Sequence, residues 1–167
     1  MQQQVYSSPL GDLSLISHKG SLVYCNWIED DCAPKEKRIK NKIGEATFDI
    51  VDKKVIETTV CQLDEYFRGE RRDFQIPLMF YGTDFQEKVW HFIASISYGK
   101  TMAYKELAIR CGSATLSRAV ASACGKNPIA IIIPCHRVVA SNNTLGGYTG
   151  GLPKKSSLLN LETRHTG

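Results

Sequence analysis

Residues 131–138 read IIIPCHRV, an apolar run that leads through a proline into a cysteine, a histidine and an arginine. Isoleucine runs are usually buried, so this run should carry Cys135 into the interior of a domain. Most buried cysteines are inert, but a thiol becomes a nucleophile when a nearby base or positive charge stabilises its thiolate. The sequence therefore leaves two interpretations open, a structural cysteine and a reactive one.

A glycine-rich segment downstream favours the reactive interpretation. Residues 145–151 read LGGYTGG, with glycines on both sides of Tyr148 and Thr149. Glycines let backbone amides approach a ligand, so the Thr149 amide could donate to an oxygen while Tyr148 covers an aromatic ligand. Glu162 becomes relevant only if it reaches His136, where it would fix the tautomer that a base needs. A plain surface turn and an exposed glutamate are the alternative.

The N-terminal part is expected to form a small antiparallel sheet followed by a helix. Residues 5–28 alternate apolar and polar side chains and contain hairpin-like turns at 9–11 and 19–20. Residues 29–52 are charged and irregular, and we interpret them as a loop or short strand. Over residues 53–67 the apolar positions recur every three or four residues, which predicts an amphipathic helix.

A domain boundary is predicted near Gly82, after which the pattern becomes mainly helical. Thr83 or Asp84 can cap the first helix. Residues 104–110 predict a short helix, and Ser113 can cap the next one. Two short helices joined by a glycine-containing turn are typical of a helix-turn-helix.

The C-terminal end should close with one more helix. Residues 153–161 are amphipathic, and Pro153 suits the first turn of a helix. Residues 163–167 are expected to form a frayed tail.

The charge distribution suggests an anionic partner for the C-terminal half. Residues 1–82 carry 11 Lys and Arg against 13 Asp and Glu, whereas residues 83–167 carry 10 against 4. Nucleic acid is the first candidate for such a partner. The second helix of the pair carries Arg118 among alanines and serines, which let a helix approach another surface closely. Contact with DNA and tight packing in a core both fit that pattern.

The composition is that of an ordinary globular chain of 167 residues, 43% hydrophobic and 23% charged. No apolar run is long enough to cross a membrane and no signal peptide is evident, so a cytoplasmic protein is expected. Six cysteines without a CxxC pair should then be free thiols. A zinc site using Cys25, Cys32 and a distant histidine is conceivable, but structural zinc ligands are usually closely spaced, so no metal is predicted.

Taken together, these segments make the chain resemble the O6-alkylguanine-DNA alkyltransferases, or methylated-DNA–protein-cysteine methyltransferases. The match runs from SPLG at 8–11 to Glu162, and IPCHRVV and GGYTGG are its most specific segments. The resemblance implies an α+β fold. A small ribonuclease-H-like domain with a sheet and a helix is expected over 1–82, and a mainly helical DNA-binding and alkyl-transfer domain over 83–162. The tail over 163–167 follows.

The resemblance also implies a role for each residue of the reaction site. Cys135 is the expected alkyl acceptor, and His136 its base, acting through a bridging water. Glu162 should orient that histidine. Asn127 should tie the helix-turn-helix to the active-site loop, and Tyr104 should help to rotate the nucleotide and donate to guanine N3.

A substrate pocket and a DNA interface are implied in the same way. Tyr148 should flank the alkyl group, the Thr149 amide should face O6, and the Val138 carbonyl should take the guanine amino group. Ala130 stands where some relatives carry a proline beside the alkyl pocket. Arg118 should enter the duplex where the nucleotide has left. The other residues expected at the DNA are Ala114, Thr115, Ala119 and Tyr104.

The implied function is single-turnover DNA repair by a monomer without a cofactor. The alkyl group of O6-alkylguanine in double-stranded DNA, with O4-alkylthymine as a second possible substrate, would move irreversibly to Cys135. The target atom lies inside the duplex, so the nucleotide must be flipped, at a cost of about a few kcal/mol. Two alternatives stay open. One is a DNA-lesion-binding protein without transfer activity, and the other is a cysteine hydrolase using Cys135, His136 and Glu162 with turnover.

Overall fold

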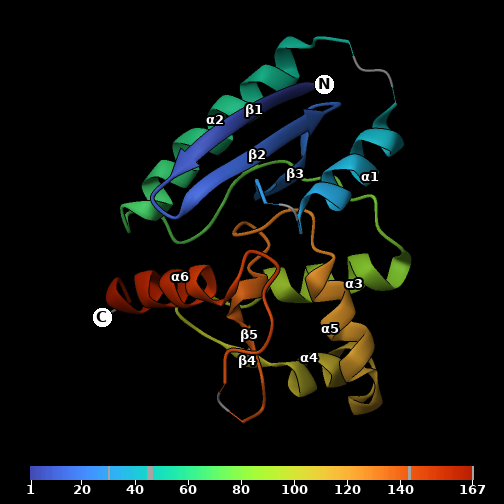
Figure 1. The fold of residues 1–167 in the computed structure, drawn as a ribbon, viewed down its shortest axis with the longest axis vertical. Helices are drawn as coiled ribbons and strands as arrows, with labels where there is room; N and C mark the ends of the chain where they lie inside the picture. The colour runs from blue at the N-terminus through green and yellow to red at the C-terminus, as the bar shows by residue number, and fades with distance from the viewer. Residues whose placement is uncertain (30, 45–46, 143, 167) are drawn as a thin grey trace. The chain divides into compact units, whose positions relative to one another are not determined.

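The structure is a computed structural model that describes residues 1–29, 31–44, 47–142 and 144–166 (Figure 1). The chain divides into two units, Met1–Tyr81 and Gly82–Gly167. The first unit holds a sheet with two helices and the second is mainly helical, which confirms the predicted α+β class. No helix among the described residues is long and apolar enough to cross a membrane.

The first unit is built on an antiparallel sheet of order β1-β2-β3, as predicted. Its strands are β1 (Gln2–Ser8), β2 (Gly11–His18) and β3 (Ser21–Trp27). Helix α2 (Ile50–Phe67) runs along the sheet in Figure 1 and contacts all three strands. It begins before the predicted start because the Asp49 side chain caps it, accepting from the Val51 amide at 2.9 Å.

The interpretation of residues 29–52 as a loop or short strand was wrong. They contain helix α1 (Ala33–Ile43), with a proline in its first turn and Gly44, at φ 73°, just after its end. Ile39 is the one buried side chain of this helix, and it packs in a cluster with Ile16, Val23 and Tyr24. A helix with one buried apolar side chain among many lysines has no clear helical period in its sequence. The segment was therefore interpreted as irregular.

The second unit begins with helix α3 (Asp84–Ala94), which Thr83 caps as predicted. The Thr83 hydroxyl accepts from the Gln86 amide at 3.2 Å, and the Gln86 side chain accepts in turn from the Thr83 amide at 3.1 Å. The indole of Trp90 on this helix donates to the Ala123 carbonyl at 2.9 Å. Helix α3 is thereby fixed to the segment that carries the predicted DNA contacts.

Both helices of the predicted helix-turn-helix pair are present. They are α4 (Tyr104–Cys111) and α5 (Ser117–Gly125), with the 3₁₀ turn η1 (Ala114–Leu116) between them. Ser113 caps the turn rather than an α-helix, since its hydroxyl accepts from the Thr115 amide at 3.2 Å. Figure 1 shows α4 and α5 together at one end of this unit.

The remaining elements surround the predicted site. The 3₁₀ turn η2 (Cys135–Arg137) leads into β5 (Val138–Val139), which pairs in parallel with β4 (Met102–Ala103). Because β4 runs directly into α4, this parallel pairing sets the start of α4 beside the end of β5.

The last helix, α6 (Leu152–Arg164), is longer than predicted. The expected tail over 163–167 was wrong for Thr163 and Arg164, which are helical. The Thr163 hydroxyl donates to the Leu159 carbonyl at 2.9 Å, and the Thr166 hydroxyl donates to the Glu162 carbonyl. These side chains bond back to the preceding turn and order the end of the helix. Gly167 lies outside the described residues.

Candidate active site

Cys135 lines a cavity of about 370 Å³ in the second unit. Its side chain is largely buried, with 9% of the residue exposed. The walls of the cavity come from α4, from the C-terminal part of α5 and from the glycine-rich loop before α6. The lining residues are Tyr104, Ala121, Cys124, Gly125, Cys135, Gly147, Tyr148 and Thr149.

The run before Cys135 is buried as predicted, and it is strongly bent. Ile131 has φ 70°, in the left-handed region that branched side chains rarely adopt. The Ile132 amide donates to the Ala130 carbonyl at 2.8 Å, and the Ile133 amide donates to the Ile129 carbonyl at 3.0 Å. The bend places Cys135 at the cavity, and a strained residue of this kind persists only where its surroundings fix it.

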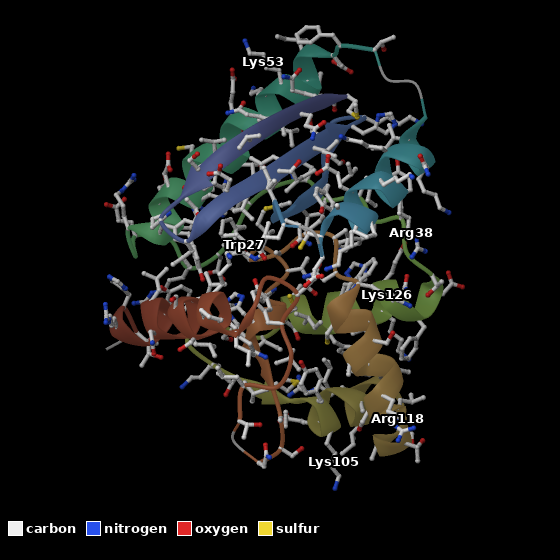
Figure 2. The ribbon with its side chains drawn as sticks, in the orientation of Figure 1. Trp27, Arg38, Lys53, Lys105, Arg118 and Lys126 are labelled. Atoms are coloured by element: carbon white, nitrogen blue, oxygen red, sulfur yellow. The ribbon has the colours of Figure 1, made fainter. Side chains whose placement is uncertain are left out.

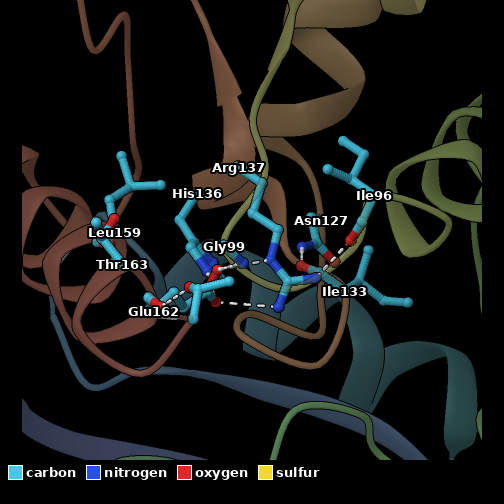
Figure 3. Close-up of polar contacts among 10 residues, drawn as sticks. Ile96, Gly99, Asn127, Ile133, His136, Arg137, Leu159, Glu162 and Thr163 are labelled. Carbon is cyan, nitrogen blue, oxygen red and sulfur yellow. Dashed lines mark hydrogen bonds and ion pairs between the residues drawn. The ribbon is translucent and has the colours of Figure 1, made fainter.

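Asn127, just beyond α5, holds this bend. Its amide nitrogen donates to the Ile133 carbonyl at 2.8 Å, and its oxygen accepts from the Ile129 amide at 3.0 Å. The side chain is 2% exposed, so both bonds are shielded from water. Asn127 thus links the end of α5 to the residues that lead into Cys135 (Figure 3).

The two residues that follow Cys135 in the chain, His136 and Arg137, form a buried ionic network with Glu162 (Figure 3). His136 Nε2 lies 2.7 Å from Glu162 Oε1. Arg137 donates to both carboxylate oxygens, from Nε at 2.9 Å and from Nη2 at 3.0 Å. The Gly99 amide donates to Oε2 at 3.1 Å, and Arg137 Nη1 donates to the Ile96 carbonyl at 2.5 Å. The condition set by the sequence, that Glu162 must reach His136, is met.

This network fixes the charges of its members. Burial would raise the pKa of Glu162, but hydrogen bonds and charges from His136 and Arg137 outweigh it and lower the pKa to about 2. Burial lowers the pKa of His136, although Glu162 acts in the opposite direction. Since a carboxylate only accepts, Nε2 of a neutral His136 carries the proton. His136 Nδ1 is buried and has no hydrogen-bond partner among the described residues, so it is the atom able to take a proton.

Tyr104 and the glycine-rich loop form the opposite wall of the cavity. Burial, followed by the nearby thiols Cys124 and Cys135, raises the pKa of Tyr104 to about 12. Its hydroxyl therefore keeps its proton and remains a donor. A Cβ at Gly146, where φ is +67°, would lie 3.0 Å from the Tyr104 ring, so both the backbone and the space favour glycine there.

The predicted substrate-binding residues fall into two groups. Tyr148 and Thr149 line the cavity, and the Thr149 hydroxyl donates to the Gly125 carbonyl at 3.1 Å. Val138 and Ala130 are buried and are not among the described residues that line it. The Val138 carbonyl already accepts from Lys155 Nζ at 2.6 Å.

Four of the predicted DNA-contacting residues lie on η1 and α5 and face solvent, whereas Tyr104, the fifth, is on α4 and lines the cavity. Ala114, Thr115, Arg118 and Ala119 are all exposed. Figure 2 shows Arg118 on α5, at the end of the unit where Lys105 of α4 is also labelled. The exposure of these residues removes the alternative that their small side chains serve core packing.

Sequence reasoning missed two buried cations, Arg137 and Lys155. Arg137 stands inside the IPCHRVV segment, and its position next to His136 was the available signal. Lys155 is 0% exposed and donates to three backbone carbonyls. Nothing in the sequence distinguishes it from its neighbour Lys154. Within the described part of the chain, no group of three or more His, Cys, Asp or Glu side chains could hold a metal ion.

Both units match models of the same protein family. The family model "6-O-methylguanine DNA methyltransferase, ribonuclease-like domain" matches residues 1–80, and "6-O-methylguanine DNA methyltransferase, DNA binding domain" matches residues 84–164. A methylated-DNA–protein-cysteine methyltransferase of Mycobacterium tuberculosis is 39% identical over 155 residues, which cover 93% of this chain and 88% of the relative. The Methanosarcina acetivorans protein of that name is 37% identical over 162 residues, 97% of this chain and 98% of the relative.

Solved structures extend the likeness to the whole fold. The Mycobacterium tuberculosis O6-methylguanine methyltransferase has a TM-score of 0.83 and 37% identity, over 99% of this chain and 94% of that one. The structure of Mycobacterium tuberculosis OGT in complex with DNA has a TM-score of 0.82 and 36% identity, with the same coverage. The resemblance seen in the sequence is thus confirmed, and the chain belongs to the 6-O-methylguanine DNA methyltransferase family.

Proposed function

We propose that the chain repairs DNA by moving the alkyl group of O6-alkylguanine in duplex DNA to the sulfur of its own Cys135. Each molecule acts once, as a monomer, and the domain over residues 83–162 carries both the DNA contacts and the chemistry. The observation that carries this proposal is the placement of Cys135 in a cavity that two tyrosines line, next in the chain to a histidine that pairs with Glu162. About 370 Å³ suits a flipped base with a small alkyl group.

The transfer begins with loss of the thiol proton. His136 Nδ1 takes this proton through a bridging water, while Glu162 holds Nε2–H and stabilises the imidazolium that forms. The Cys135 thiolate attacks the alkyl carbon, forming an S–C bond as the C–O6 bond breaks. The electron pair of that bond stays on the guanine, which gains a proton as it leaves. The thioether on Cys135 has no route back to a thiol, so the reaction stops after one event.

Tyr104 assists the leaving group. Its hydroxyl remains protonated because burial raises its pKa to about 12, and it donates to guanine N3 as charge builds on the base. Tyr148 flanks the alkyl group, and the Thr149 amide faces O6 from the same loop. These residues bring a donor and an aromatic face to the cavity that holds the acceptor.

Binding to DNA uses the exposed face of η1 and α5. Ala114, Thr115 and Ala119 let this face approach the duplex closely, and Arg118 fills the space left by the flipped nucleotide. The protein selects damage rather than sequence, so phosphate contacts dominate its affinity, which should fall as salt rises.

The test is the intact mass of the protein after it is mixed with a duplex that holds one O6-methylguanine. We expect a gain of one CH₂ per chain that stops at one equivalent and maps to Cys135. Cys135→Ser should gain nothing, while Cys61→Ser, which removes an exposed thiol, should react like the wild type. Binding without mass gain would indicate a lesion-binding protein. Release of product beyond one equivalent would indicate a hydrolase, and either result overturns the proposal.

A further inference from the structure

Lys155 on α6 is a buried cation with a complete set of acceptors. Its Nζ donates to the carbonyls of Val138 at 2.6 Å, Leu145 and Gly147 at 3.1 Å. An ammonium group has three N–H donors, so every donor is used on backbone. Among the described residues, no carboxylate forms an ion pair with it. Lysine is rarely fully buried, so this arrangement requires a reason.

The three carbonyls belong to two segments, which also meet at a backbone hydrogen bond from the Ala140 amide to the Thr144 carbonyl at 3.1 Å. Val138 is in β5, directly after η2, whereas Leu145 and Gly147 are in the loop that leads to Tyr148. Gly147 and Tyr148 line the cavity, and Cys135 precedes Val138 by three positions. Lys155 therefore ties the cavity wall to the segment that carries the acceptor cysteine.

The same ammonium group also lies close to the other wall. Its Nζ is 5.9 Å from the centre of the Tyr104 ring, within the range of a cation–π contact. Burial lowers the pKa of Lys155 by more than the neighbouring thiols Cys135 and Cys124 raise it, so the pKa lies below its ordinary value. A cation held at this point has α4, α5, η2 and the loop over 145–147 around it.

We propose that Lys155 is a positioning residue of the transfer site, whose ammonium group holds the loop over 145–147 against Val138 and so fixes the wall that receives the flipped base. This inference rests on the proposed function. It differs from general stabilisation, because the bonds of Lys155 end on the cavity wall and on β5. The exposed face of η1 and α5 makes none of them.

The decisive variant is Lys155→Met, which keeps the length of the side chain and removes all three hydrogen bonds. Single-turnover rates measured against protein concentration separate the limiting transfer rate from the half-saturating concentration. Misplacing reacting groups by about 1 Å costs about 100-fold in rate, so the limiting rate should fall by that order. Affinity for an undamaged duplex of the same sequence should stay within about twofold, because the exposed DNA face is unchanged. Lys154→Met, the same change one residue away, should match the wild type.

A second measurement reports on the wall directly. Hydrogen exchange of backbone amides in Lys155→Met should quicken over residues 144–150, with little change in α3 and α5. Lys155→Gln, which keeps two donors on a shorter side chain, should give an intermediate rate. A limiting rate equal to wild type, or a loss of rate matched by an equal loss of affinity for undamaged DNA, overturns the inference.

Three further outcomes would overturn this inference, the proposed function or both. Failure of both Lys155 variants to fold would make Lys155 a determinant of the fold and remove its positioning role. A wild-type chain that takes no methyl group would remove the proposed function, and this inference with it. A wild type that reacts beside a Lys155→Met chain of unchanged rate would remove this inference alone.

Discussion

His136 Nε2 and Glu162 Oε1 lie 2.7 Å apart, and neither side chain is exposed to solvent. Arg137 approaches the same carboxylate from the other side through Nε and Nη2. One buried carboxylate therefore orients His136, the base in the proposed reaction, and balances a buried guanidinium. Because its pKa is about 2, it stays charged at every pH at which the protein would work.

Replacing Glu162 by Gln should slow the transfer by about 10- to 100-fold, since a neutral amide no longer stabilises the imidazolium. The pH–rate profile should also move to higher pH, because the thiolate–imidazolium pair loses its balancing charge. Both quantities follow from single-turnover rates on an O6-methylguanine duplex measured over a range of pH. Glu57→Gln, at an exposed position of α2, is the matched control. An unmoved profile in Glu162→Gln would count against the relay through His136.

Replacing Arg137 by Met should destabilise the protein by about 3–5 kcal/mol, because a buried carboxylate loses its main positive partner. The double variant Arg137→Met with Glu162→Gln should lose less than the sum of the single changes, since it removes both charges. Denaturant unfolding of the four proteins completes the cycle. Arg68→Met is the control, because Arg68 pairs with Glu70 at 2.8 Å on the surface and should contribute little. Additive losses in the cycle would exclude coupling between Arg137 and Glu162.

Stability should fall as the solution becomes acidic, and His136 should cause the first part of the fall. Burial holds its folded-state pKa below the ordinary 6.5, so the unfolded chain binds the proton first. Stability from this group is complete above about 6.5 and declines below it, by at most about 1.4 kcal/mol per pH unit. The depressed pKa of Glu162 gives a second decline, from about 4.5 toward 2.

Unfolding free energies measured across this range test both declines. His136→Asn should flatten the first one, and His91→Asn, at an exposed position of α3, should leave it in place. The first decline surviving unchanged in His136→Asn would assign it to another group.

Replacing Asn127 by Ala should cost about 1–3 kcal/mol, because it removes two buried hydrogen bonds and leaves the Ile129 amide without the Asn127 oxygen, while the Ile133 carbonyl keeps its bond from the Cys135 amide at 2.8 Å. The bend that sets Cys135 at the cavity should then relax. We expect faster hydrogen exchange over residues 129–135 and a slower transfer, at similar affinity for DNA. Asn160→Ala, at an exposed position of α6, is the control. Unaltered exchange over that segment would remove Asn127 as its anchor.

The elements that could be predicted are those whose signal is local. Two hairpin turns predicted the sheet, the Thr83 cap predicted the start of α3, and a regular apolar period predicted α2. Helix α1 was missed because a helix that buries one residue, Ile39, has almost no period. The turn at Ser113 was expected as an α-helix, because a capping serine does not separate an α-helix from a 3₁₀ turn.

The residues of the candidate site likewise divide into those that the sequence could predict and those that it could not. His136 and Glu162 could be paired from the sequence because the family segments carry them. Lys155 could not be found, because its burial follows from three carbonyls supplied by β5 and by the loop over 145–147. The same contacts bear on Val138, whose predicted role stays a prediction. Its carbonyl, expected to take the guanine amino group, already accepts from Lys155, so only its second lone pair remains available.

Arg118 is exposed on α5 and is well away in sequence from Cys135. If it fills the gap left by the flipped nucleotide, Arg118→Ala should slow repair of O6-methylguanine in a duplex by about 10- to 100-fold, the equivalent of a few kcal/mol of flipping cost. Reaction with the free base O6-methylguanine needs no flipping and should be unchanged. Arg110→Ala is the matched control, because Arg110 is exposed on α4 and pairs with Glu106 at 3.2 Å. The rate on the duplex and the rate on the free base together test whether Arg118 fills the gap. Equal slowing on duplex and free base would place the effect of Arg118 in the cavity itself. Slowing that disappears at saturating protein would indicate that Arg118 only contacts a phosphate. The salt dependence of binding would then be weaker in Arg118→Ala than in the wild type.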